Sequence, residues 1–103
     1  MRVIIKAPGR IPLITDIKNT LERLQSAVGG YIEAVPMISP GVVCICNEEG
    51  KIKRGFEPNF FFFHDVIMGT AVFAGTGEEE FRSLTNDEIG SVIDYLGNNR
   101  LLR

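Results

Sequence analysis

The apolar segments of this chain mostly follow one another at intervals too short for parallel strands, and this spacing constrains the fold more than any other feature. A parallel pair needs a crossover of about a dozen residues or more, whereas a tight turn can join antiparallel strands. We therefore predict one α+β domain over residues 1–103, with a largely antiparallel mixed sheet and two helices in the order β-β-α-β-β-loop-β-β-α. The segments with a strand-like pattern are residues 3–5, 13–15, 31–37, 42–46, 60–63 and 66–73.

The first segment with helical periodicity is NTLERLQSAVGG, residues 19–30. Asn19 is placed as the N-cap, and Glu22 three residues later can complete a capping box. Gly29 can adopt the left-handed conformation that ends many helices. A single apolar stripe of Leu21, Leu24 and Val28 predicts that this helix lies on a sheet.

The second helical segment is LTNDEIGSVIDYLGNN, residues 84–99. Thr85 is the expected N-cap, with Glu88 completing a capping box, and Leu84 is placed to contact Ile89 across the first turn. We expect Gly97 to end the helix. Its apolar stripe is Ile89, Val92, Ile93 and Leu96.

Charge and hydropathy exclude several classes of protein. The chain has 11 basic and 13 acidic residues, a net charge of −2, and so lacks the basic surplus that nucleic-acid binding usually requires. No apolar run approaches the roughly 20 residues that span a membrane, and Lys6 closes the first run. We therefore expect no nucleic-acid or membrane partner, and we do not expect MRVIIKAPGR to act as a secretory signal.

The chain has few residues of the types that commonly act in catalysis or bind metals. His64 is the only histidine, and its neighbour Asp65 cannot readily orient the ring, because adjacent side chains on a strand point to opposite faces. Cys44 and Cys46 share one face of a strand, where a disulfide between them would be strained, so we expect buried thiols in a reducing cytoplasm. A zinc site would need further ligands. We predict no catalytic residue, metal or cofactor, although a pair of carboxylates acting as acid and base stays open.

A short basic cluster is a candidate ligand site. Lys51 is the last residue of the turn NEEGK, and Lys53 and Arg54 follow it. These three residues could meet the phosphate of a small anionic ligand while aromatic rings stack its base. The alternative is a solvated hairpin tip, because three glutamates flank the cluster.

Four consecutive phenylalanines stand in NFFFFHDV, residues 59–66. In an extended segment one face carries Phe60, Phe62, His64 and Val66, and the other carries Phe61, Phe63, Asp65 and Ile67. A two-layer domain of this size seldom covers both faces of an end strand. We therefore predict that one pair packs in the core and the other is partly exposed, in a homodimer or larger homo-oligomer with these rings at or near the interface. The alternative is a core strand covered on both faces.

Several stretches together resemble a known family. NTLERLQSAVGGYIEAV, CNEEGK, DVIMGTAV and EFRSLTNDE are similar to a family of small uncharacterised proteins, a domain of unknown function, from phages, plasmids and conjugative elements of Gram-positive bacteria. The resemblance implies an accessory protein of a mobile element, acting in the bacterial cytoplasm, and it supplies no catalytic residues. The chain departs from the family pattern after Pro58 and Asn59, where Phe60–Phe63 replaces polar or arginine-containing residues.

Three hypotheses about function follow from the sequence. The first is a non-enzymatic accessory protein that binds a host protein or a protein of the mobile element. The second is a protein that binds or sequesters a small nucleotide-like molecule. The third is an enzyme that uses carboxylates.

Overall fold

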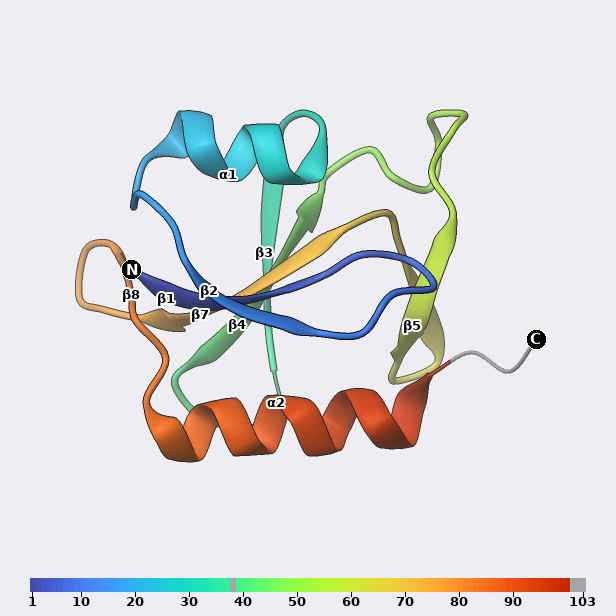
Figure 1. The fold of residues 1–103 in the computed structure, drawn as a ribbon. Coiled ribbons are helices and arrows are strands. Elements are labelled where there is room, and N and C mark those ends of the chain that lie inside the picture. The colour runs from blue at the N-terminus through green and yellow to red at the C-terminus, as the bar shows by residue number, and fades with distance from the viewer. Residues whose placement is uncertain (38, 101–103) are drawn as a thin grey trace.

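The sheet at the centre of the fold is antiparallel throughout. The computed structural model describes residues 1–37 and 39–100. The strand order is β2-β1-β7-β4-β3, and the short β8 also pairs with β7 (Figure 1). The strands are β1 (Arg2–Lys6), β2 (Leu13–Asp16), β3 (Ile32–Pro36), β4 (Val42–Asn47), β7 (Ala71–Thr76) and β8 (Phe81–Arg82).

Both faces of this sheet are covered. Helix α1 (Leu21–Val28) packs over β3, β4 and β7 on one face. Helix α2 (Asn86–Asn99) lies on the other face with a separate hairpin of β5 (Pro58–Phe62) and β6 (Asp65–Met68). Figure 1 shows the sheet between the two helices. The α+β class and the largely antiparallel sheet are confirmed. The fold has three layers, whereas the argument about the phenylalanines assumed two.

Side chains alternate along the central strands and divide the core into two parts. Val3 and Val72 point toward α1, whereas Ile4 and Phe73 point toward α2. Every residue of β4 is buried, so this strand reads as a nearly continuous apolar run in the sequence. The α2 part of the core is the larger one: Ile4, Val42, Cys44, Cys46, Phe60, Phe62, Ile67, Ala71, Phe73, Leu84, Ile89, Val92 and Leu96.

The N-cap of α1 is Thr20, so the prediction of Asn19 is wrong by one residue. The Thr20 hydroxyl accepts a hydrogen bond of 3.2 Å from the Arg23 amide. The Asn19 side chain turns away from the helix and donates to the Phe81 carbonyl at 2.8 Å. The predicted end of the helix is confirmed, because Gly29 has a φ of 80° and its amide bonds the Gln25 carbonyl.

Helix α2 begins as predicted and ends later than predicted. Thr85 and Glu88 form both hydrogen bonds of the capping box. Gly97 does not end the helix, which continues to Asn99. Arg100 then forms an isolated antiparallel bridge with Phe60, and this pairing holds the last turn against β5. Neither helix of the described residues is long and apolar enough to span a membrane.

The segment 66–73 is two strands and not one. Gly69, with a φ of 82°, separates β6 from β7, and its carbonyl accepts a hydrogen bond of 2.7 Å from the Asn59 amide group. The two strands therefore belong to different sheets. The chain also turns at Phe63, whose φ is 58°, so the extended segment predicted to run past His64 is interrupted there.

Candidate functional site

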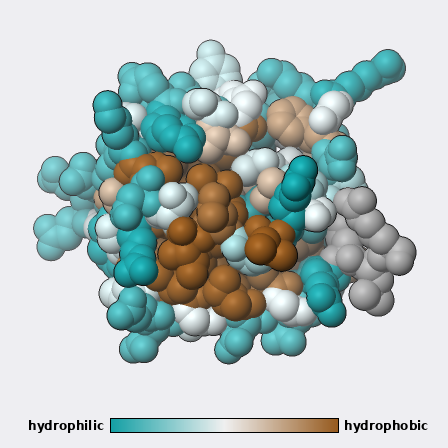
Figure 2. Space-filling model, in the orientation of Figure 1, coloured by the Kyte–Doolittle hydropathy of each residue, from teal (hydrophilic) through white to brown (hydrophobic). Residues whose placement is uncertain are grey.

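The outer edge of β2 is an uncovered apolar region. Leu13 and Ile14 on β2 are 57% and 45% exposed, and Ile11 in the preceding loop is 86% exposed. Figure 2, in the orientation of Figure 1, shows hydrophobic side chains gathered at the centre of the molecule, over β2. Ile93 of α2 is also partly exposed and lines the same cavity as Ile11. We call Ile11, Leu13, Ile14 and Ile93 the β2 surface.

The position of β2 explains this exposure. Ile14 pairs with Ile4 and Leu13 with Ile5, so the two β2 side chains point to opposite faces of the sheet. Helix α1 covers mainly β3, β4 and β7, which leaves Leu13 outside its cover. The other edge strand, β3, carries Glu33 and ends at Pro36, two features that discourage pairing with another strand.

A cavity of about 450 Å3 opens beside the β2 surface. Three parts of the chain enclose it: the β1–β2 loop, the start of β5 and the last half of α2. Its volume lies within the roughly 300 to 1,000 Å3 that is typical of small-ligand sites. The described residues that line it are Lys6, Gly9, Arg10, Ile11, Pro12, Pro58, Asn59, Ile93, Leu96, Gly97 and Arg100.

A buried polar network contributes to the cavity wall. The Lys6 ammonium donates to the Ala7 carbonyl at 2.8 Å and to the Asn59 side-chain oxygen at 3.0 Å. The Asn59 amide group donates to the Lys6 carbonyl and the Gly69 carbonyl, both at 2.7 Å. A buried ammonium or amide is tolerated only when it is hydrogen-bonded, so this network fixes the hairpin of β5 and β6 to β1.

The charges around the cavity have one sign. Lys6, Arg10 and Arg100 line it, and none of its described lining residues is acidic. The remaining lining includes the aliphatic side chains of Ile11 and Leu96. The arrangement can bind an anion that carries an apolar group, because arginine pairs with carboxylates and phosphates through parallel N–H bonds.

The basic cluster predicted from the sequence lies elsewhere, in the turn between β4 and β5. Lys51 forms an ion pair with Asp65, and Lys53 bonds Glu49 at 3.1 Å. The hydrogen bond from Lys51 lowers the pKa of Asp65. Lys51 and Lys53 thus already have carboxylate partners, and Arg54 is exposed beside them. Their role in binding a ligand stays a prediction.

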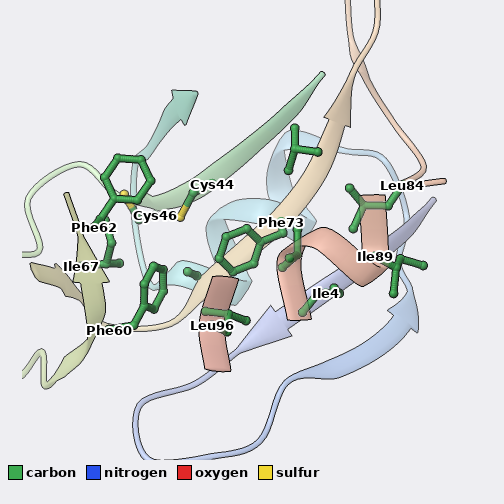
Figure 3. Close-up of a cluster of buried hydrophobic side chains, with 13 residues drawn as sticks. Ile4, Cys44, Cys46, Phe60, Phe62, Ile67, Phe73, Leu84, Ile89 and Leu96 are labelled. Atoms are coloured by element: carbon green, nitrogen blue, oxygen red, sulfur yellow. The ribbon is translucent and has the colours of Figure 1, made fainter. Parts of the chain in front are cut away.

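The four phenylalanines divide into a buried pair and an exposed pair, as predicted, although β5 ends at Phe62 and the chain turns at Phe63. Phe60 and Phe62 are buried and point into the core, where the Phe60 ring lies 5.7 Å from that of Phe73 (Figure 3). Phe61 and Phe63 are 44% and 61% exposed. Because the chain turns at Phe63, Ile67 comes back opposite Phe60 and is buried with it. The prediction that Ile67 shares the face of Phe61 and Phe63 is therefore wrong.

The two cysteines lie in the core, and the histidine lies on the surface. Cys44 and Cys46 are free, buried and on the same face of β4. A hydrogen bond to Cys46 and burial raise the pKa of Cys44 well above its ordinary value, so Cys44 is an inert thiol. His64 is exposed at the turn between β5 and β6.

Sequence reasoning missed the cavity and the β2 surface. Lys6, Arg10 and Asn59 lie far apart along the chain, and only the β1–β2 loop and the β5 hairpin bring them together. One sequence signal was present. The stretch IPLIT, residues 11–15, has apolar side chains on both faces and no charge, which is unusual for a strand that ends a sheet.

Comparison with protein families places the chain in a group defined by sequence. The family model described as "Domain of unknown function (DUF3846)" matches residues 1–97. The chain belongs to this family. In this DUF3846 protein the matched residues include Lys6, Arg10 and Asn59 and stop before Arg100. No curated protein and no solved structure matches the chain.

Proposed function

We propose that this DUF3846 protein is a non-enzymatic accessory protein of a phage or other mobile element, and that it binds a host or element-encoded protein in the bacterial cytoplasm. One observation carries the proposal: the β2 surface is apolar, exposed and next to an unpaired strand edge within the described chain. Such an edge offers backbone N–H and C=O groups to an added strand. The apolar side chains around it supply contact area at the centre of an interface.

A matched pair of leucines tests this proposal. Leu13 is 57% exposed on β2, and Leu21 is 54% exposed on α1. We expect Leu13→Lys to abolish co-purification of one specific protein from the bacterial host, identified by mass spectrometry, and Leu21→Lys to retain it. The two variants change the same residue type at the same exposure, so a general effect of a new charge is controlled. Loss of the partner in both variants, or in neither, would contradict binding at the β2 surface.

A homo-oligomer is the second part of the proposal, and the exposed pair of Phe61 and Phe63 supports it. Each fully buried ring stabilises a protein by about 1.5 to 3 kcal/mol relative to an exposed ring, so association that covers both is favourable. We expect the double change Phe61→Asp and Phe63→Asp to give a folded monomer in sedimentation at micromolar concentration. The same change at Phe60 and Phe62 should give an unfolded chain. A wild-type protein that sediments as a monomer would contradict the oligomer.

A small anionic ligand at Lys51, Lys53 and Arg54 is a separate hypothesis with its own test. Replacing all three with serine should abolish binding of a nucleotide by the purified protein while leaving the melting temperature nearly unchanged. Equal nucleotide affinity in the triple variant would remove these residues from the site.

A further inference from the structure

The rim of the cavity beside β2 has the chemistry of a carboxylate site. Arg10 and Arg100 are both exposed there, although they come from opposite ends of the described chain. The Lys6 ammonium already bonds Ala7 and Asn59, so the two guanidinium groups are the ones placed to meet an anion. Ile11 and Ile93 supply an apolar wall next to them. A ligand that fits these features has a carboxylate attached to an apolar group.

The direction of β2 relates this site to the strand edge. β2 runs away from the cavity, from Leu13 beside the cavity-lining Pro12 to Asp16. Every strand pairing of the described sheet is antiparallel. A segment that pairs antiparallel with β2 therefore runs toward the cavity, and its C-terminal end lies beside the cavity.

Pro12 determines where such pairing must stop. It precedes β2 and has no N–H group, so it cannot donate a hydrogen bond to an added strand. The last residue of the added segment therefore leaves the ladder near Leu13, beside the residues that line the cavity. The end of the ladder and the two arginines thus occupy the same part of the molecule.

We propose that this cavity receives the free C-terminal carboxylate and the last apolar side chain of an extended protein segment that pairs antiparallel with β2. The inference rests on the proposed function, because the segment belongs to the bound protein. Backbone hydrogen bonds to β2 give affinity that depends little on sequence, whereas the carboxylate and the last side chain select the partner. Charge complementarity identifies the occupant: two arginines face the cavity, and a protein C-terminus ends in an anion.

A selection from a peptide library with free C-termini tests the inference. Nine-residue random peptides, displayed with a free C-terminal carboxylate, are selected on the protein of residues 1–103. The strongest binder is then synthesised as the free acid and as the C-terminal amide, and both are titrated by fluorescence anisotropy. We expect the amide to bind at least about tenfold more weakly, because it lacks the charge-assisted hydrogen bonds to arginine.

Matched variants locate the effect. Arg10→Gln and Arg100→Gln should each weaken binding of the acid and leave binding of the amide unchanged. Arg23→Gln on α1 removes the same charge on the other side of the sheet and should change neither. N-acetyl-leucine, which has the carboxylate and the side chain but no strand, should compete only weakly.

The outcomes separate this inference from the proposed function. Equal binding of acid and amide, or no selected peptide, overturns the capture of a C-terminus. If the peptides bind equally as acid and amide but lose binding with Leu13→Lys, the β2 surface still binds protein and only the carboxylate site fails. Competition by N-acetyl-leucine as strong as that of the peptide overturns the pairing with β2.

Discussion

The cost of shortening a phenylalanine should depend strongly on its position within Phe60–Phe63. Phe60 is fully buried, and its ring lies 5.7 Å from that of Phe73. Phe60→Ala leaves a cavity in the α2 part of the core and should lower the free energy of unfolding by about 3 to 5 kcal/mol. Phe63 is 61% exposed, so Phe63→Ala loses less than half of a ring's burial, or about 1 kcal/mol. Both changes remove the same atoms from the same hairpin.

Urea denaturation followed by circular dichroism measures the two costs. The expected difference is about 2 to 4 kcal/mol, a large part of the 5 to 15 kcal/mol that stabilises a typical domain. The experiment should be done at a protein concentration where sedimentation shows a monomer, since association through Phe63 would add to its cost. Equal losses for Phe60→Ala and Phe63→Ala at that concentration would refute the assignment of a buried and an exposed pair.

Two further predictions concern a carboxyl group and the glycines. The hydrogen bond from Arg82 lowers the pKa of Glu88 from its ordinary value of 4.5 to about 2. The ionised carboxylate therefore stabilises the fold above pH 4.5, and this stabilisation is lost as the pH falls toward 2. Glu88→Gln should make the free energy of unfolding less dependent on pH between 4.5 and 2, and an unchanged dependence would contradict the ion pair. Gly97 is helical, so Gly97→Ala should raise the free energy of unfolding by about 0.5 to 1 kcal/mol, as should Gly90→Ala, where a new Cβ meets nothing within 4 Å. Gly69→Ala should lower the free energy of unfolding, because Gly69 has a φ of 82° and a Cβ there would lie 2.6 Å from the Phe56 ring. If Gly97→Ala also lowered it, Gly97 would be the end of α2 and not a residue inside the helix.

The sequence predicted features that depend on neighbouring residues. The capping box of Thr85 and Glu88, the left-handed Gly29 and the alternation of Phe60 and Phe61 are all set within a few positions of the chain. Short intervals between apolar segments predict the antiparallel pairs β1–β2, β3–β4 and β5–β6, because they leave no room for a crossover. These features were confirmed for a common physical reason: each is a local constraint on the backbone.

The errors arose where distant contacts decide between local alternatives. Asn19 and Thr20 are both good caps, and the hydrogen bond of Asn19 to Phe81 settles the choice. Gly97 can end a helix, but the pairing of Arg100 with Phe60 extends it. The cavity could not be predicted at all, because its lining comes from three separate parts of the chain.

The central position of β7 has a consequence for how the chain acquires its structure. The pairs β1–β2 and β3–β4 are each close in sequence. In the described part of the chain β7 alone joins them, by pairing with β1 on one side and β4 on the other. A ribosome makes β7 after both pairs, so a nascent chain that ends before Ala71 has two hairpins and no common sheet. Pairing at such long sequence separation slows folding relative to a fold with local contacts. The strands of the first two thirds of the chain can therefore form a common sheet only after β7, at the start of the last third, has been synthesised.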